Sequence, residues 1–489
     1  MKYRLILAAC LTLTATLSAQ EQRALTLADA VALAQRQGLA AEAARSQLES
    51  ARWADRAFSA SLLPRLGLVA DAPSLVNRSI DAVPQPDGST AFVPVRVQQG
   101  SLLLGVTQRL PFTGGDLTVG SGLSRTRSLA SADGQSWDQS WRTTPFEVRL
   151  SQSILRPREV VWDRRERASV NELAERQYLE AREEIAASTS AAYFDLFAAQ
   201  ASLQNAEANA AVNDSLYVIS KGRFEVGKIG ENDLLQSELA LLRARASVDA
   251  ARLERDRAEA SLRRLTGVRD AAPLVVTAPP TGPAVEVDPS AAATEALRNS
   301  SVVELAILQR TQASRRVNAA RLGSLPGATV TASAGFNQTA SAFDLVYRDL
   351  LERQQFGVRV DMPLLQWGGG KAAVQAARAD AQRVESQGRA RREELEQEAR
   401  FAALQLSQAQ RVLAISAKAD TVAAKRFDVA KNRYMIGRIG IDNLFVAQSE
   451  KDAALLAYVA ALRGYWTAYY RLRRVTLHDF AEGRPVGER

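Results

Sequence analysis

Two parts of this sequence repeat each other, and the duplication limits the fold more than any other feature. Three short blocks recur at one constant spacing of 210 residues, in a register that spans about 120 residues. A chain built from two copies of one unit is expected to fold as two similar structural repeats. The matching blocks are 146–155 with 356–365, 221–230 with 431–440, and 262–266 with 472–476.

The beginnings of the two repeats match at a larger spacing of 262 residues. Leu63-Pro64 then corresponds to Leu325-Pro326, and the difference of 52 residues is extra sequence in the first repeat, between Pro64 and Phe146. A Pro-rich stretch between the repeats marks a linker. The predicted organisation is a first repeat at 20–267, a linker at 268–290, a second repeat at 291–476 and a C-terminal tail at 477–489.

Long segments of both repeats carry small or apolar residues at alternating spacings of four and three. Such heptads predict α-helices that pack as a left-handed coiled coil. In the first repeat the seam runs through Ile185, Thr189, Ala192 and Leu196, and in the second through Leu395, Ala399, Ala402 and Leu406. The predicted helices are 27–63, 157–226, 231–267, 291–325, 367–436 and 441–475. A helix over 157–226 would be roughly 105 Å long.

Between the helices, each repeat holds a segment in which apolar and polar residues alternate, as in a β-strand with two different faces. The apolar positions are Phe146, Val148 and Leu150 in the first repeat and Phe356, Val358 and Val360 in the second. Strands of about ten residues can cross a bilayer when tilted. We therefore predict that these six residues face lipid. A half-buried strand of a soluble sheet would show the same alternation, but long coiled-coil helices offer no obvious sheet to cover.

The extra sequence of the first repeat contains further candidate strands, near Arg65–Asp71, Ser101–Leu110 and Leu117–Arg127. The stretch 77–100, with Pro84, Pro86, Gly88 and Pro94, is predicted to be a loop. Past the N-terminus, the chain contains no apolar run of about 18 residues. If the protein sits in a membrane, it must therefore do so as a β-barrel, which satisfies every backbone polar group in lipid.

The N-terminus reads as a secretory signal peptide, which assigns the chain to an extracytoplasmic compartment. Lys2 and Arg4 precede an apolar stretch, and Leu17-Ser18-Ala19 offers a small-residue cleavage site. The signal peptide is therefore predicted at 1–19. An alternative is a lipoprotein signal in which Cys10 is lipid-modified, although the apolar run before Cys10 is short.

The residues that usually carry catalysis or metal binding are nearly absent. Cys10 is the only cysteine and His478 the only histidine, so neither a zinc site nor a nucleophile–histidine pair is expected. The sequence 368–371 resembles part of a phosphate-binding loop but lacks the Ser or Thr after the lysine, which favours a strand-to-helix turn. We predict no enzyme activity, no cofactor and no metal.

Charged residues are interleaved along the helices, and the net charge of +8 is modest for 489 residues. This pattern is typical of solvated helix faces and does not indicate a nucleic-acid partner. The acidic pairs Glu183-Glu184 and Glu393-Glu394 are predicted to be solvated in the same way.

Taken together, the signal peptide, the two repeats and a Val/Ile-Gly turn in each helical hairpin resemble the TolC-like outer-membrane efflux protein family. The most specific marks are Arg223–Gly230 with Asp233-Leu234, Arg433–Gly440 with Leu444, and the strand-to-helix sequence Met362–Gly370. The resemblance covers nearly the whole mature chain. Two departures are Asn443 at the position that corresponds to Asp233, and the 52 extra residues.

The resemblance implies a mostly α fold with transmembrane β: a homotrimeric coiled-coil barrel in the periplasm, continued by a β-barrel in outer-membrane lipid. Its function would be that of a passive duct in a tripartite efflux or type I secretion system, joined to an inner-membrane pump by a periplasmic adaptor. The implied adaptor-docking residues are Gly227, Lys228, Ile229, Gly230, Gly437, Arg438, Ile439 and Gly440. The implied candidates for the entrance gate are Asp233, Arg433, Tyr434 and Asp442. A periplasmic coiled-coil adaptor or scaffold is the alternative, but it would not explain the two matched sets of strands.

Overall fold

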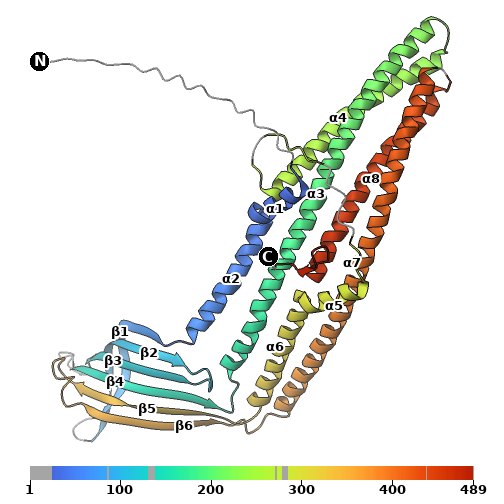
Figure 1. The fold of residues 1–489 in the computed structure, drawn as a ribbon. Coiled ribbons are helices and arrows are strands. Elements are labelled where there is room, and N and C mark those ends of the chain that lie inside the picture. Colours follow the sequence, from blue (N-terminus) through green and yellow to red (C-terminus); the bar gives the residue numbers. More distant parts are fainter. Residues whose placement is uncertain are drawn as a thin grey trace, which may run out of the picture. The chain divides into compact units, whose positions relative to one another are not determined.

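The computed structural model of the chain describes residues 25–84, 88–129, 138–269, 272–277, 285–436 and 438–487. These residues form two compact units (Figure 1). The first unit contains the described residues of Met1–Ala44, Leu179–Glu295 and Glu398–Arg489, and the second contains those of Arg45–Tyr178 and Ala296–Gln397. The predicted signal peptide at 1–19, with Cys10, lies outside the described residues, and so does Gly437.

Eight helices of the described chain follow the duplication. The first repeat contains α1 (Leu27–Gln37), α2 (Leu39–Ser61), α3 (Glu159–Glu225) and α4 (Glu231–Thr266). The second contains their counterparts α5 (Pro289–Asn299), α6 (Ser301–Gly323), α7 (Gly369–Met435) and α8 (Ile441–Thr476). All six predicted helical segments are therefore helical, with ends that shift by a few residues.

Two predicted helices are each broken in two, at equivalent positions of the repeats. Gly38 separates α1 from α2, and Ser300 separates α5 from α6, with φ −67° and ψ 144° at both residues. A Cβ atom at Gly38 would lie 2.6 Å from the carbonyl oxygen of Leu265, so this close approach requires glycine. Ser300 starts α6 by accepting a hydrogen bond from the backbone N–H of Val302. Both local signals are compatible with a continuous heptad, which explains why periodicity alone predicted single helices.

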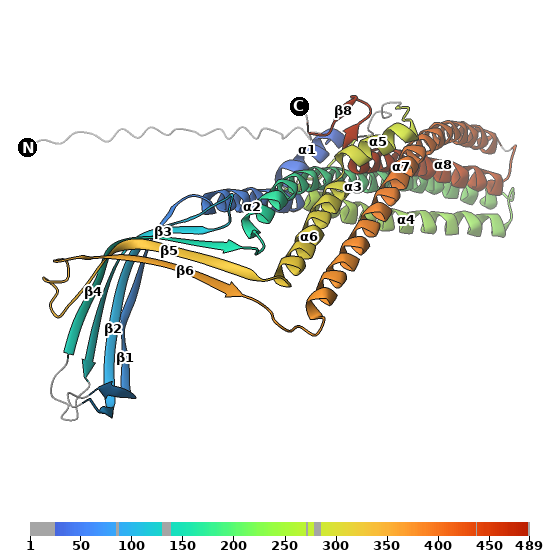
Figure 2. The ribbon, with the colours of Figure 1, turned by 90° about the horizontal axis from the view of Figure 1, so that it is seen from below.

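The second unit contains one six-stranded antiparallel sheet in the order β1-β2-β3-β4-β5-β6 (Figure 2). The strands are β1 (Arg65–Pro84), β2 (Thr90–Arg109), β3 (Asp116–Leu129), β4 (Asp138–Ile154), β5 (Gly327–Ala340) and β6 (Leu351–Asp361). The extra sequence of the first repeat thus accounts for four strands in that repeat against two in the second.

The prediction of a loop at 77–100 was wrong, because β1 extends to Pro84 and β2 begins at Thr90. Two register shifts in β1 let the chain continue as strand there. Pro94 is tolerated because β2 pairs with β3 only from Arg96 onward, so at Pro94 it has β1 as its single neighbour.

The first unit contains four helical segments side by side, in the order α4, α3, α8, α7 (Figure 1). Ion pairs and hydrogen bonds connect each neighbouring pair. Arg245 of α4 contacts Asp214 of α3, Asn205 of α3 contacts Asp452 of α8, and Arg426 of α7 contacts Glu450 of α8. Helices α4 and α7 are therefore the two edges of this layer.

A large apolar cluster holds the first unit together away from the hairpin tips. It includes Tyr193 and Leu196 of α3 and Leu462 and Tyr465 of α8, all at most 1% exposed. The Tyr193 hydroxyl also donates to the carbonyl oxygens of Leu25 and Thr277. Among the described residues, no helix is long and apolar enough to span a membrane.

Candidate functional site

The turn between α3 and α4 ends the first helix in a Schellman motif. The Lys228 N–H donates to the Arg223 carbonyl at 2.8 Å, and the Gly227 N–H donates to the Phe224 carbonyl at 2.8 Å. Gly227 has φ +70°, a left-handed conformation that glycine adopts without strain. Gly230 then precedes α4 as its N-cap, in an extended conformation. This local chemistry reverses the chain within five residues.

The turn between α7 and α8 repeats this geometry 210 residues later. The Arg438 N–H donates to the Arg433 carbonyl at 2.8 Å, which matches the bond from Lys228 to Arg223. Gly440 caps α8 with φ −73° and ψ 164°, close to the values of −80° and 163° at Gly230. The described residues of the two tips therefore share one backbone hydrogen bond and one cap geometry.

The predicted docking side chains do not share one environment. Lys228 and Arg438 are exposed, as a docking surface needs. Ile439, however, is only partly exposed and packs on a buried cluster, which contains Tyr434 and Leu444 of the second hairpin and Leu216 of α3. The most exposed apolar side chains of the tips are the equivalent residues Val226 and Ile436, each 66% exposed, which the sequence reasoning did not select.

Two of the four gate candidates, Tyr434 and Asp442, contact side chains of the first repeat. Tyr434 is 5% exposed, and the guanidinium carbon of Arg223 lies 5.5 Å from its ring centroid. Asp442 accepts a hydrogen bond of 2.6 Å from the side-chain amide of Gln236, which joins the first residues of α8 to those of α4. Arg433 and Asp233 are exposed, and among the described residues neither is brought into contact with the others.

Polar side chains of α3 and α8 connect the two repeats along the helices, further from the turns than the gate candidates. The sequence did not predict these contacts. The two carboxylate oxygens of Asp452 accept from the side-chain amides of Asn205 at 2.6 Å and Asn209 at 2.8 Å. Asn213 and Gln448 are buried next to them and line a cavity of about 440 Å³. The spacing of the three asparagines, four residues apart, was a readable signal that they share one helix face.

A buried ion cluster ties the C-terminal segment to α3 and corrects the prediction that Glu183 is solvated. Glu183 is 2% exposed, and its carboxylate lies 3.0 Å from the Arg473 Nε. Arg473 also reaches Asp479 of the short strand β7 (His478–Asp479), which pairs with β8 (Arg484–Pro485). Burial raises the pKa of Glu183, and the charge of Arg473 opposes that rise. Glu184, in contrast, is exposed and pairs with Arg474.

One face of the six-stranded sheet is apolar across all its strands. The pairings put Val148 opposite Val119 and Ala334, and Phe356 opposite Ala332, so all six predicted strand residues share this face. Neighbours on the same face include Leu66, Leu68, Leu102, Leu104, Val106, Leu117, Val119 and Leu123. We call it the apolar face.

The opposite face of the sheet is rich in polar and small residues, and we call it the polar face. It carries Arg142, Glu147, Arg149, Ser333, Arg353 and Arg359. Arg149 forms an ion pair of 3.0 Å with Glu147 on this face. The described residues hold no cluster of side chains suited to a metal ion.

Known proteins with a similar sequence or fold include outer-membrane efflux proteins and outer-membrane channels. The sequence matches the family described as outer membrane efflux protein over residues 116–268 and 292–476. No curated protein matches the sequence.

Several solved structures share the fold. The CmeC outer membrane channel of Campylobacter jejuni has 17% identity, with 95% of this chain and 87% of that chain covered and a TM-score of 0.67. The outer membrane protein VceC of Vibrio cholerae has 16% identity, with coverage of 92% and 95% and a TM-score of 0.63. The MtrE outer membrane channel of Neisseria gonorrhoeae has 15% identity, with coverage of 92% and 88% and a TM-score of 0.63. Identities this low establish the fold only.

The family match begins after β2 and includes strands β3 to β6, the long helices of both repeats and both hairpin turns. The chain therefore belongs to the outer membrane efflux protein family, and it is an outer-membrane efflux channel with a long periplasmic extension, a passive duct and not an enzyme.

Proposed function

We propose that three copies of this chain form one duct that serves a tripartite efflux or type I secretion system. The sheets of the three copies would close into one β-barrel in outer-membrane lipid, and the helices would form a tunnel through the periplasm. A periplasmic adaptor would join the tunnel to an inner-membrane pump. In this proposal the mature chain consists of a first repeat at 20–267, a linker at 268–290, a second repeat at 291–476 and a tail at 477–489.

The trimer is supported most strongly by the open edges of the sheet and of the helical layer. The sheet ends in β1 and β6, and the helical layer ends in α4 and α7, so the two edges of each are different. Strands β1 and β6 each pair on one side only, and open edges are not tolerated in lipid. Within the chain, the first strand of the second repeat, β5, pairs with the last strand of the first repeat, β4. The duplication then predicts that β1 pairs with β6 of the next copy. Such head-to-tail contacts close into rings when the rotation permits.

The helical layer supports the same closure with specific residues. Helix α7 and the residue after its end carry an exposed heptad stripe of Ile415, Val422, Val429 and Ile436, between 54% and 69% exposed. Helix α4, at the other edge, exposes Leu235, Leu239 and Leu242, between 46% and 57% exposed. Exposed apolar stripes of this kind mark interaction surfaces.

The duplication also predicts which of these residues meet. Asn205 of α3 binds Asp452 of α8 inside the chain. Their equivalents at the constant spacing of 210 residues are Ile415 of α7 and Leu242 of α4, which lie at opposite edges of one chain. We therefore infer that Leu242 of one copy packs on Ile415 of the next, with an apolar pair in place of the polar one.

The two faces of the sheet support the barrel and give its first test. Val148→Arg and Val358→Arg would put a charge on the proposed lipid face, at a cost of about 2–4 kcal/mol near the middle of the bilayer. We expect both variants to be depleted from the outer membrane, as measured by fractionation and trimer detection. Arg149→Ala and Arg359→Ala, on the polar face, are the matched controls and should insert normally while changing conductance. Equal insertion of all four variants would refute the assignment of the faces.

The two tips are proposed as the docking surface for the adaptor. Gly227 and Gly230 form the sharp turn of the first tip, Gly440 caps α8 at the second, and Lys228 and Arg438 are exposed charges. By the duplication, Gly437 is proposed to take the role of Gly227. Ile229 and Ile439 would supply apolar contacts to a helical hairpin of the partner, as the family resemblance implies. Because Ile439 packs on the buried cluster, Ile229 is the cleaner residue to test.

Ile229→Asp is expected to abolish export and cross-linking of the tips to the adaptor, while trimers persist in the outer membrane. Ile439→Asp should lower export and also weaken the trimer's resistance to heat, because it charges a side chain packed on the buried cluster. A control is Glu231→Gln, an exposed change next to the same tip. Full export by the Ile229 variant at normal protein level would refute docking and leave the tips as turns.

The gate is proposed to close through contacts between the two hairpins of each chain. Asp442 with Gln236, and Tyr434 with Arg223, each connect the second repeat to the first. Asp233 and Arg433 are exposed and would engage a neighbouring copy. MtrE has been solved in an open state, which supports a closed state and an open state in this family. Adaptor contacts that favour the open arrangement would shift the equilibrium toward it.

A further inference from the structure

The apolar face of the sheet becomes cationic and aromatic toward the strand ends that lie away from the helices. Along β3, the face continues from Leu123 to Arg125 and then to Arg127, and the residues opposite these arginines on β4 are Trp141 and Gln139. On β2 the corresponding positions are Gly100 and Gln98. The two arginines and the indole of Trp141 thus lie next to the end of a continuous apolar surface.

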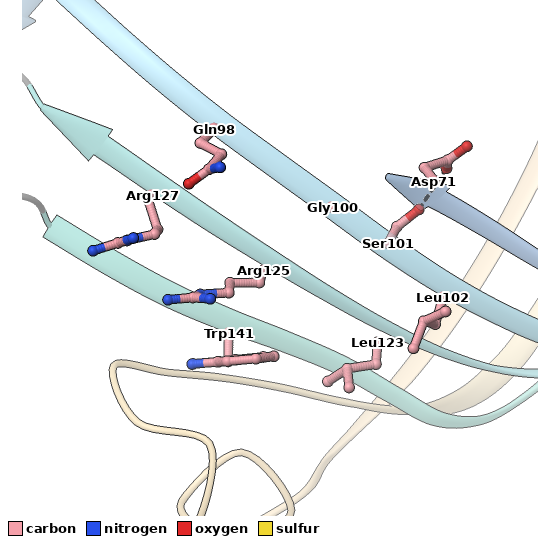
Figure 3. Close-up of a pocket in the computed structure, with 9 residues that line it drawn as sticks. All are labelled: Asp71, Gln98, Gly100, Ser101, Leu102, Leu123, Arg125, Arg127 and Trp141. Atoms are coloured by element: carbon pink, nitrogen blue, oxygen red, sulfur yellow. Dashed lines mark hydrogen bonds between the residues drawn. The ribbon is translucent and has the colours of Figure 1, made fainter. Parts of the chain in front are cut away.

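A cavity of about 230 Å³ lies among these residues (Figure 3). Its lining consists of Asp71, Gln98, Gly100, Ser101, Leu102, Leu123, Arg125, Arg127 and Trp141. Gly100 has no side chain opposite Arg125, which leaves the space open. One end of the lining is therefore apolar, at Leu102 and Leu123, and the other is cationic.

The charge of Arg125 is available to an anion. Its Nε and Nη2 atoms donate to the neutral Oε1 of Gln139 at 3.2 and 2.6 Å, and its guanidinium carbon lies 5.3 Å from the centroid of the Trp141 ring. Asp71 is the one acid of the lining, and it accepts a hydrogen bond of 2.6 Å from Ser101. Guanidinium groups match the geometry of phosphate oxygens, and two neighbouring ones can grip one phosphate.

The position along the strands corresponds to one level of the membrane. Chain segments at the start of β1 and the end of β4 lead directly to helices α2 and α3, so those strand ends face the periplasm, and Arg125, Arg127 and Trp141 lie toward the outside. Trp141 stacks edge-on with Phe343 at 5.1 Å, and Phe343 with Tyr347 at 6.2 Å. Clustered aromatic residues next to an apolar band are typical of the lipid headgroup level.

We infer that this cavity binds the phosphate of an outer-leaflet lipid, with the acyl chains lying along Leu102 and Leu123. The inference rests on the proposed barrel, in which the apolar face meets lipid. An arginine at mid-bilayer depth would be costly, whereas an arginine at the headgroup level is tolerated and attracts anionic lipid. The arginines, the indole and the apolar surface lie side by side, which favours a lipid over a free anion. A free phosphate would contact only the arginines.

The test uses the full mature chain, purified from the outer membrane and transferred to detergent with defined lipids. Native mass spectrometry would count bound molecules of a diphosphorylated, acylated glucosamine lipid and of the same lipid without phosphates. Wild-type trimers are expected to bind the phosphorylated lipid about tenfold or more tightly than the other. Arg125→Gln with Arg127→Gln should remove this preference, and Arg125→Lys with Arg127→Lys should keep most of it.

The matched control is Arg142→Gln with Arg353→Gln, which removes two arginines from the polar face of the same sheet. This pair should bind the phosphorylated lipid as the wild type does. Inorganic phosphate in large excess should not displace the lipid, and displacement would show a free-anion site and overturn the inference. Equal binding of both lipids by wild-type trimers would overturn it as well. Recovery of the wild type as a soluble periplasmic monomer would instead refute the proposed barrel, so the two failures are distinguishable.

Discussion

In their described residues, the two hairpin tips share a backbone hydrogen bond and a cap geometry, but their side chains have different surroundings. In the second repeat, Leu444 is completely buried and Tyr434 is 5% exposed, in a cluster that also includes Leu216 of α3. Their equivalents in the first repeat are Leu234, which is only partly buried, and Phe224, which is 39% exposed. The duplication preserved the turn, whereas the packing of the side chains depends on which helices lie beside each tip.

The cause of the difference is the order of the four helices. Along the layer, helix α8 lies between α3 and α7, whereas its counterpart α4 lies at the edge, beside α3, and reaches α8 through the hydrogen bond from Gln236 to Asp442. Apolar residues of α4 therefore stay exposed in one copy, as Leu242 does, and the equivalent position of α8, Asp452, is satisfied by two asparagines. We interpret the tip of the first repeat, where Leu234 and Phe224 stay partly exposed, as the one whose packing is completed by another copy.

The largest expected effect concerns the buried tip. Leu444→Ala should lower the free energy of unfolding by about 2–5 kcal/mol, because it leaves a cavity in a closed cluster. Leu234→Ala, the equivalent change in the first repeat, should cost less than about 2 kcal/mol, because the side chain is already partly exposed. Urea unfolding of the refolded protein in detergent, followed by circular dichroism, measures both. Equal losses would contradict the unequal packing of the tips.

A smaller effect is expected where the tips meet. Asp442→Ala removes the hydrogen bond from Gln236, worth about 1 kcal/mol or roughly a fivefold shift in the closed–open equilibrium of each chain. The closed channel should therefore conduct more often in planar bilayers. Asp233→Ala is the matched control, since it removes a carboxylate at the start of α4 that has no partner among the described residues of its own chain. If the control opens the channel as often, the bond within the chain does not hold the gate.

Most of the helices and the sidedness of the strands could be predicted, because each depends on a periodic pattern. Heptads predict α3 and α7, and alternation correctly grouped Val148 with Val358 on one face. The break at Gly38 was missed because it depends on a close approach to Leu265, a residue far away in the sequence. The continuation of β2 through Pro94 was missed because tolerance of proline depends on which strands lie beside it.

The candidate site was less predictable than the fold. The glycine turns were readable, because a left-handed residue at Gly227 is a local requirement. The partial burial of Ile439 and the full burial of Glu183 were not, since both depend on which helix lies opposite. For the same reason, the hydrogen bond between Gln236 and Asp442 could not be predicted, since the two residues lie 206 positions apart in the sequence.

The central claim is that unlike edges of neighbouring copies meet in a closed ring of three. The mature chain contains no cysteine if it is cut after Ala19, so Leu242→Cys combined with Ile415→Cys gives a clean cross-linking pair. Oxidation in intact cells should yield covalently linked dimers and trimers. Leu242→Cys with Ala414→Cys is the control, because one residue along α7 turns the thiol by about 100° away from the stripe. A double variant that reaches the outer membrane yet yields only monomers on oxidation would contradict the account.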